Sequence, residues 1–351
     1  MEAAGLAAQA GSNWQQDVLR THACYIGCVI ASSTHHRFVP WFPMPLRLFL
    51  TSGDLMADRR FEFARDLQLK GDLPAAADLI EQAIELAPNF TSAWFTLGEI
   101  RAQLGERDKA IAAFREARRA DPDDQHGAAL HLMRLGDAQL AEMPKAYVQA
   151  LFDQYAPRFE HTLINDLGYR APSLIFKAVL AARVAARKPA LFKRAIDLGC
   201  GTGLAAAAFA KQVDHFIGID LSAGMIKEAR ATNLYAELEV ADMIEGLRSK
   251  ADGCANLVVA ADAFVYLSDL APVLSEARRV LVSGGVLAFT LETHDGNGIV
   301  LGEGLRYAHS AEYVRGAIAK AGLKLLTLEP ASPRIENNEP VRGLVIVAEK
   351  T

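Results

Sequence analysis

The chain has 351 residues, of which 51% are hydrophobic and 23% are charged, and its formal net charge is −5. This length and composition predict about two globular domains with a sizeable buried core. The weakly acidic charge argues against a nucleic-acid partner, because such partners call for a basic surface. No apolar run approaches the length that crosses a bilayer, so we expect no membrane span.

The four cysteines, Cys24, Cys28, Cys200 and Cys254, are too few and too scattered for a disulfide framework. Cys24 and Cys28 have the spacing of half a metal site, but no second pair of cysteines or histidines completes it. Because a structural zinc ion needs about four ligands, no metal is expected. This use of cysteine favours a reducing, cytoplasmic location.

Residues 1–55 differ in character from the rest of the chain. They contain Trp14, a cluster of two histidines and an arginine at 35–37, and a proline-broken aromatic run at 41–45. No helical or strand period is sustained across them. We therefore expect a poorly ordered extension outside the folded unit, with the helical sequence beginning at Met56.

Residues 56–143 repeat with a period of 34 residues, which is the length of a tetratricopeptide repeat. The matched pairs are Gly71 and Gly105, Ala76 and Ala110, Ala83 and Ala117, and Pro88 and Pro122. The small residues let the two helices of a repeat approach closely, and each proline ends the second helix. The second copy resembles the family pattern at Trp94, Leu97, Gly98, Ala110, Phe114 and Pro122.

A further helix, at about residues 125–141, is expected to cap the exposed end of this array. The repeats are predicted to bind a peptide or a partner protein. An equally open alternative is a helical appendage that stabilises a dimer or covers the neighbouring domain, because a full concave surface takes about three repeats.

Residues 144–351 begin with a helical, aromatic-rich stretch over 147–180 and then alternate short apolar runs with helical segments. This alternation predicts an α/β domain with a Rossmann-like, largely parallel sheet of seven strands. No helix joins the last two runs, so we expect the last strand to be antiparallel, at one side of the sheet. The runs lie at 194–198, 216–219, 238–241, 257–261, 285–291, 323–328 and 344–348.

The loop after the first strand reads DLGCGTG over residues 197–203, and Asp220 ends the second strand. Glycines let the backbone turn tightly into a helix and pass close to a ligand, and a carboxylate such as Asp220 can accept from both hydroxyls of a ribose. The dinucleotide fingerprint fits poorly, because the sixth position counted from Gly199 is Leu204. Asp197 would repel a pyrophosphate but would attract the ammonium and sulfonium groups of S-adenosylmethionine.

From about residue 147 to residue 350, the chain resembles the class I S-adenosylmethionine-dependent methyltransferases. Asp197, Gly199, Gly201 and Gly203 match the first motif of that family, and Asp220 matches its ribose-binding acid. Together with the repeats, the chain resembles a bacterial group of predicted methyltransferases that carry tetratricopeptide repeats. The resemblance implies an S-adenosylmethionine-dependent methyltransferase domain over residues 144–351.

The same resemblance implies further contacts with the cofactor. Met225 belongs to the segment that continues from the ribose-binding acid, and Asp242 and Met243 match the pair that contacts adenine. Ala261 falls where the fourth strand ends against the cofactor, and Tyr155 matches an aromatic residue that closes over it.

The reaction is expected to be an in-line displacement that depends mainly on positioning and on exclusion of water. A general base is needed only if the acceptor must first lose a proton, and His309, Tyr266 and His294 are the candidates. The acceptor is predicted to be a small metabolite or a group carried by a protein. The alternative is a repeat-based interaction protein whose methyltransferase-like domain is not catalytic.

Overall fold

The computed structural model describes residues 48–159, 168–336 and 338–351. Most of the expected extension over residues 1–55, including Cys24 and Cys28, therefore lies outside the described residues. Residues 49–54 pack onto the repeats: the Leu50 amide donates to Ser92 Oγ at 2.9 Å, and the Phe49 ring lies 5.5 Å from that of Phe61. Packed chain is thus present ahead of Met56.

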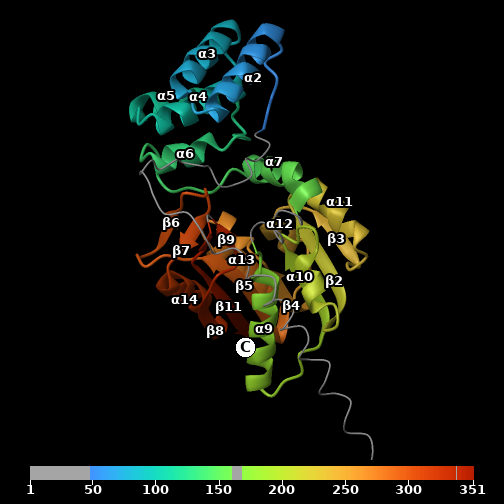
Figure 1. Ribbon diagram of the computed structural model, residues 1–351. Coiled ribbons are helices and arrows are strands. Elements are labelled where there is room, and N and C mark those ends of the chain that lie inside the picture. Colours follow the sequence, from blue (N-terminus) through green and yellow to red (C-terminus); the bar gives the residue numbers. More distant parts are fainter. Residues whose placement is uncertain (1–47, 160–167, 337) are drawn as a thin grey trace, which may run out of the picture. The chain divides into compact units, whose positions relative to one another are not determined.

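The repeat region consists of two antiparallel helix pairs followed by a short helix (Figure 1). The Asp54 carboxylate accepts from the Met56 amide at 2.8 Å and begins the first helix at Leu55. The helices are α2 (Leu55–Leu69), α3 (Leu73–Leu86), α4 (Thr91–Gln103), α5 (Arg107–Ala120) and α6 (Ala128–Arg134).

The prolines and the small residues of the repeat have the structural roles that the 34-residue period predicts. Helix α3 ends just before Pro88, and α5 ends just before Pro122. A Cβ on Gly98 would lie 2.7 Å from the Phe114 ring, so this glycine is needed for α4 to approach α5. The capping helix is shorter than the expected 125–141, because glycines with positive φ at 127 and 136 enclose it.

A second helical group precedes the sheet. It consists of α7 (Lys145–Tyr155), the short η1 (Ala156–Arg158) and α9 (Ala171–Ala185). The segment between α6 and α7 contacts the sheet domain, where Tyr307 Oη donates to the Ala141 carbonyl at 2.5 Å and Met143 is buried beside Leu130.

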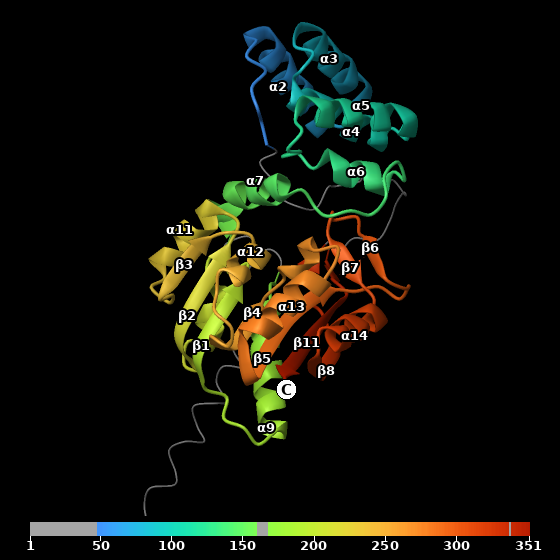
Figure 2. The same cartoon turned by 180° about the vertical axis from the view of Figure 1, so that it is seen from behind.

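The α/β domain is confirmed, and its sheet has the order β3-β2-β1-β4-β5-β11-β8 (Figure 2). Two short strands, β6 and β7, join this seven-strand path beside β5 and were not expected. The strands are β1 (Phe192–Leu198), β2 (Val213–Asp220), β3 (Glu237–Val240), β4 (Ala255–Ala260), β5 (Leu281–Glu292), β6 (Ile299–Leu301), β7 (Tyr307–His309), β8 (Leu323–Ala331) and β11 (Gly343–Lys350).

The last strand is antiparallel, as expected, but it lies inside the sheet rather than at one side. It is inserted between β5 and β8 and pairs antiparallel with both. The connection from β8 is a small hairpin of β9 (Ile335–Glu336) and β10 (Glu339–Pro340), without a helix among its described residues. A hairpin-type return reverses the chain, whereas a parallel neighbour needs a long crossover.

Helices cover both faces of the sheet (Figures 1 and 2). On one face α9 and α10 pack against Val259, Ala288 and Val345; on the other, α12, α13 and α14 pack against Val258, Leu287 and Ile346. Helix α11 packs on β2 and β3. These remaining helices are α10 (Leu204–Phe209), α11 (Ala223–Ala231), α12 (Met243–Arg248), η3 (Phe264–Tyr266), α13 (Ala271–Val280) and α14 (Ala311–Lys320).

Candidate functional site

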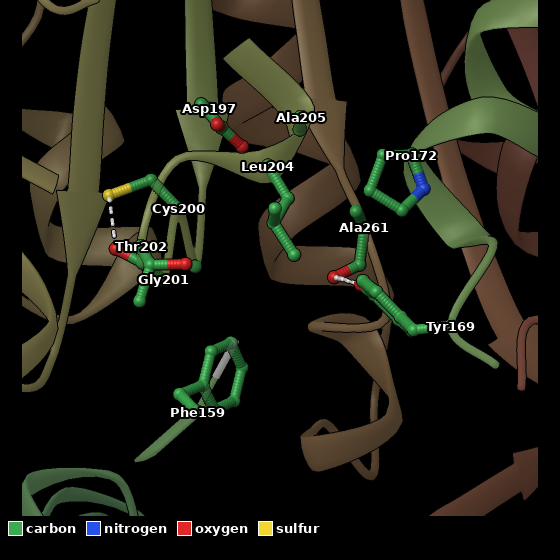
Figure 3. Close-up of a pocket in the computed structure, with 11 residues that line it drawn as sticks. Phe159, Tyr169, Pro172, Asp197, Cys200, Gly201, Thr202, Leu204, Ala205 and Ala261 are labelled. Carbon is green, nitrogen blue, oxygen red and sulfur yellow. Dashed lines mark hydrogen bonds between the residues drawn. The ribbon is translucent and has the colours of Figure 1, made fainter. Parts of the chain in front are cut away.

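A pocket opens where β1 and β4 end, at the edge of the sheet where ligands of open parallel sheets bind (Figure 3). Residues of the glycine loop form one side, and aromatic residues from the segments before β1 form the other. The lining residues are Phe159, Tyr169, Pro172, Asp197, Gly199, Cys200, Gly201, Thr202, Leu204, Ala205 and Ala261.

Three glycines allow the backbone of the loop to turn. Gly199, Gly201 and Gly203 have φ values of 63°, 54° and 104°, a left-handed region that other residues rarely adopt. A Cβ on Gly199 would lie 2.6 Å from the Cβ of Ala263, and a Cβ on Gly201 would lie 3.4 Å from the Phe159 ring. The loop forms a cradle in which the backbone conformation therefore favours glycine at all three positions, and Gly199 in addition has no room for a side chain.

The carboxylate of Asp197 lies at the base of this cradle and is 1% exposed. Its Oδ2 accepts from the Tyr235 hydroxyl at 2.7 Å, whereas its Oδ1 is buried without a hydrogen-bond partner among the described residues. Burial raises the pKa of Asp197 to about 7, against the lowering effect of the Tyr235 hydrogen bond. A buried, unpartnered carboxylate oxygen suits a ligand that brings a positive N–H donor.

Asp220, at the end of β2, ties the second strand to the loop of the first. Its Oδ2 accepts from the Gly201 amide at 2.8 Å, and its Oδ1 accepts from the Ser222 amide at 2.9 Å. Burial raises the pKa of Asp220, and these two backbone donors partly offset the rise. Each carboxylate oxygen has a second lone pair, so the group retains capacity to accept from ligand hydroxyls.

Helix α7 and η1 pack against the start of α11, beside Asp220. Asp153 Oδ1 accepts from the Ser222 hydroxyl at 2.5 Å and from the Gly224 amide at 3.1 Å. Sequence reasoning missed this role of Asp153, because the two partners are separated by 69 and 71 residues from it. Tyr155 lies on the same helix, where burial raises the pKa of its hydroxyl, and Met225 is fully buried in α11.

The two residues matched to adenine contacts lie together at the start of α12. Asp242 Oδ1 accepts from the Ile244 amide at 3.0 Å and so caps α12, while its Oδ2 lies 3.4 Å from Lys145 Nζ. Met243 is half-buried as the first residue of that helix. Ala261 lines the pocket, and its carbonyl accepts from the Tyr169 hydroxyl at 3.2 Å (Figure 3).

The candidate bases lie around η3, β5 and β7 and do not line this pocket. His309 is 0% exposed in β7, and burial lowers its pKa to about 4, so it is neutral at pH 7. Burial raises the pKa of Tyr266 to about 12, and its ring stands edge-on to that of Phe152 at 5.4 Å. His294 Nε2 lies 3.2 Å from the Gly298 carbonyl in the loop after β5.

A buried ion cluster connects the loops after β4, β5 and β8, and sequence reasoning missed it. Arg306 binds Glu292 at 2.5 Å and Glu336 at 2.6 Å; Arg334 binds Asp262, Glu292 and Glu336. Two guanidinium groups and three carboxylates leave a formal charge of −1. No local sequence pattern predicts this cluster, because its five residues are spread over positions 262–336.

Among the residues that the structure describes, no group of three or more His, Cys, Asp or Glu side chains is arranged to hold a metal ion. Within the same residues, no helix has the length and apolar character needed to cross a membrane.

Comparisons with known proteins match two parts of the chain. Residues 195–285, which contain the glycine loop and Asp220, match the family described as methyltransferase domain. Residues 61–125 match the tetratricopeptide repeat family. Both matches agree with the motifs at these positions and confirm the resemblance that the sequence indicates.

Several named proteins are similar to part of the chain. The ubiquinone biosynthesis O-methyltransferase of Xylella fastidiosa is 27% identical over 146 residues, which is 41% of this chain and 59% of that protein. Human methyltransferase-like protein 27 is 27% identical over 49% of this chain and 66% of its own length. The malonyl-[acyl-carrier protein] O-methyltransferase of Geobacter sulfurreducens is 38% identical over 28% of this chain and 38% of that protein.

The chain thus spans less than two thirds of the length of each of these relatives. Among solved structures, a Burkholderia thailandensis 1,6-didemethyltoxoflavin-N1-methyltransferase with bound S-adenosylhomocysteine is 15% identical, with a TM-score of 0.46 over 61% of this chain and 93% of that chain.

Proposed function

We propose that this chain, which joins tetratricopeptide repeats to a class I methyltransferase domain, uses S-adenosylmethionine to methylate a small metabolite or a group carried by a protein. The observation that carries the proposal is the unpartnered Oδ1 of Asp197, buried beside the glycine cradle. A buried carboxylate without a positive partner is costly, and the ammonium group of the cofactor would remove that cost.

The residues present fit the parts of the cofactor. Asp197 would pair with the ammonium group, the backbone of the loop from Gly199 to Gly203 would lie along the methionine end, and Asp220 would accept from the ribose hydroxyls. Asp242 and Met243 would contact the adenine, Met225 would lie in the segment that follows the ribose-binding acid, Ala261 would lie against the cofactor, and Tyr155 would close over it. When bound, the cofactor supplies a methyl group that its sulfonium has already activated.

The protein's own contribution is to orient the acceptor in line with that methyl group and to exclude water. Tyr266 and His309 are the proposed bases for an acceptor that must lose a proton. With a pKa of about 4, His309 is in the unprotonated form that a base requires at neutral pH. Tyr266 is joined to the cofactor pocket through edge-to-face ring contacts: its ring meets that of Phe152, which in turn meets that of Phe159 with centroids 6.0 Å apart.

The proposed acceptor classes follow the names of the relatives. One is named for ubiquinone biosynthesis, which points to a small metabolite, and another for a malonyl group on an acyl-carrier protein. A carrier-bound acceptor would also provide a protein partner for the repeats. Comparing a chain begun at Asp137 with the full chain tests this: a loss of turnover confined to carrier-bound acceptors is expected if the repeats bind the carrier.

Calorimetric titration with S-adenosylhomocysteine, with NAD as the control ligand, tests the central proposal. Micromolar binding of S-adenosylhomocysteine alone is expected, and transfer of a labelled methyl group from S-adenosylmethionine to metabolite and carrier-protein pools would then identify the acceptor. Binding of NAD alone, or of neither ligand, would contradict the proposal and favour an interaction protein with a non-catalytic domain.

A further inference from the structure

Tyr235 lies in the short connection between α11 and β3, behind the glycine loop. We infer that Tyr235 is a positioning residue for the cofactor site: its hydroxyl holds the Asp197 carboxylate in the orientation that leaves one oxygen available to the ammonium group of S-adenosylmethionine. The inference rests on the proposed function, because it assigns the free oxygen of Asp197 to that ammonium group.

The ring of Tyr235 reaches Asp197 through a slot that two glycines leave open. A Cβ on Gly203 would lie 3.2 Å from the Tyr235 ring, and a Cβ on Gly218 would lie 2.9 Å from it. Gly218 has no positive φ, so its backbone conformation does not require glycine. Glycine is needed here because a Cβ would have no room beside Tyr235 and Leu238, whose side chain would lie 2.7 Å from it.

The ring is held in this slot by packing. It stands edge-on to Phe216 of β2 with ring centroids 5.9 Å apart, and it contacts the small cluster of Cys200, Ile226 and Ala229. Because both glycines belong to elements that border the cofactor loop, the position of the hydroxyl is set by the same elements that set the loop. The hydrogen bond is therefore built into the site rather than formed by a mobile side chain.

The hydrogen bond itself determines which carboxylate oxygen is free. Tyr235 Oη donates to Asp197 Oδ2 at 2.7 Å, a length typical of a hydroxyl donating to a charged carboxylate. The other oxygen, Oδ1, is left without a partner, and Asp197 lines the pocket (Figure 3). Rotation of the carboxylate would break this bond, so Tyr235 selects the orientation in which a single oxygen is available to a ligand.

Four groups face Asp197 electrostatically: Tyr235 before β3, Asp220 at the end of β2, Cys200 in the loop after β1, and Tyr169 before α9. Burial and the Asp220 charge raise the pKa of Asp197, to about 7, and Tyr235 is the group that lowers it. Burial raises the pKa of the Tyr235 hydroxyl far above its ordinary value, so it remains a donor. Tyr235 thus favours the charged form of Asp197, against the effect of burial.

The variant Tyr235→Phe keeps the ring in its slot and removes only the hydroxyl. Without it the pKa of Asp197 rises further, so at low pH a larger fraction of the variant carries a neutral Asp197. The dissociation constant for S-adenosylhomocysteine, which retains the ammonium group, is measured by calorimetry for variant and parent. The ratio of the two constants is expected to be about tenfold near pH 6 and to approach one near pH 9.

Tyr313→Phe is the matched control, because the Tyr313 hydroxyl also donates to an aspartate, Asp269, at 3.0 Å but lies outside the cofactor pocket. Its ratio should stay near one at every pH. A ratio for Tyr235→Phe that does not change with pH, whether large or near one, would overturn the inference. A purely structural role of Tyr235 would change the affinity equally at every pH.

A second readout does not depend on cofactor binding. Titration of the Asp197 carboxyl carbon by NMR in the unliganded protein, with the signal identified by its absence in Asp197→Asn, should give a higher pKa in Tyr235→Phe than in the parent. An unchanged pKa would also overturn the inference. If the parent fails to bind S-adenosylhomocysteine while this pKa shift is present, the proposed function fails but the control of Asp197 by Tyr235 stands.

Discussion

The Gly201 amide donates to Asp220 Oδ2 at 2.8 Å, so the acid that ends β2 holds the middle of the glycine loop that follows β1. The proposed ribose-binding group and the proposed methionine cradle are therefore one hydrogen-bonded unit. A change in either element should disturb both.

Replacement of Asp220 by Ala should weaken binding of S-adenosylhomocysteine tenfold or more. It removes charge-assisted hydrogen bonds to the ribose, each worth about 1.5–3 kcal/mol, and frees the Gly201 amide. Calorimetry provides the measurement. Asp214→Ala, which removes an exposed carboxylate from the same strand, is the control and should bind like the parent. Equal affinity in Asp220→Ala would show that the cofactor does not lie where we place it.

Gly199→Ala should impair both folding stability and cofactor binding, whereas Gly253→Ala should affect stability alone. Both glycines have positive φ, 63° and 61°, where alanine costs about 1–2 kcal/mol. The Cβ at position 199 would in addition clash with Ala263 at 2.6 Å, while position 253 has nothing within 4 Å. Urea unfolding should show a larger decrease in the free energy of unfolding for Gly199→Ala than for Gly253→Ala. Equal decreases would mean that the close approach to Ala263 does not affect stability.

Asp197→Asn should stabilise the unliganded protein at alkaline pH while weakening cofactor binding. The folded-state pKa of Asp197, about 7, lies above its ordinary value of 3.8, so the folded state binds the proton more tightly than the unfolded state. Stability of the parent therefore falls as pH rises from about 4 to about 7, and stays low above that. The gain in Asp197→Asn should be about 1–3 kcal/mol larger at pH 8 than at pH 5.

Thermal unfolding of both proteins at the two pH values measures this difference. Saturation with S-adenosylhomocysteine should reverse the order at pH 8, because the ligand stabilises the parent by its greater affinity. A gain from Asp197→Asn that is the same at both pH values would show that Asp197 is not the group that titrates.

Arg334→Met should destabilise the protein by about 3 kcal/mol or more, because breaking a buried ion cluster leaves carboxylates uncompensated. Arg334 is 3% exposed and contacts three of them, so the formal charge of the cluster would change from −1 to −2. Arg342→Met is the matched control: its partner Asp295, at 2.6 Å, is exposed, and the urea midpoint should not move. Similar midpoints for both variants would contradict a structural role of the cluster.

The repeat region was predictable because its pattern is set by residues that lie close together in the sequence. A helix pair of fixed length recurs every 34 residues, and the residues that permit close approach recur with it. The glycine loop was predictable for the same reason, since a tight turn with left-handed backbone favours glycine wherever it occurs. Even the link between Ser92 and His126, whose side chains lie 3.1 Å apart, joins residues separated by one repeat period.

The sequence by itself thus determined the order of the repeat helices and of the seven main strands, the largely parallel sheet and the glycine loop after β1. Only the tertiary structure decided that β11 lies between β5 and β8, that Asp153 holds the start of α11, and that Tyr235 reaches Asp197 through the slot beside Gly218. The physical reason is distance along the chain. Turns and helix periods act between near neighbours, whereas the hydrogen bonds that orient a buried carboxylate form between residues that only the folded sheet brings together.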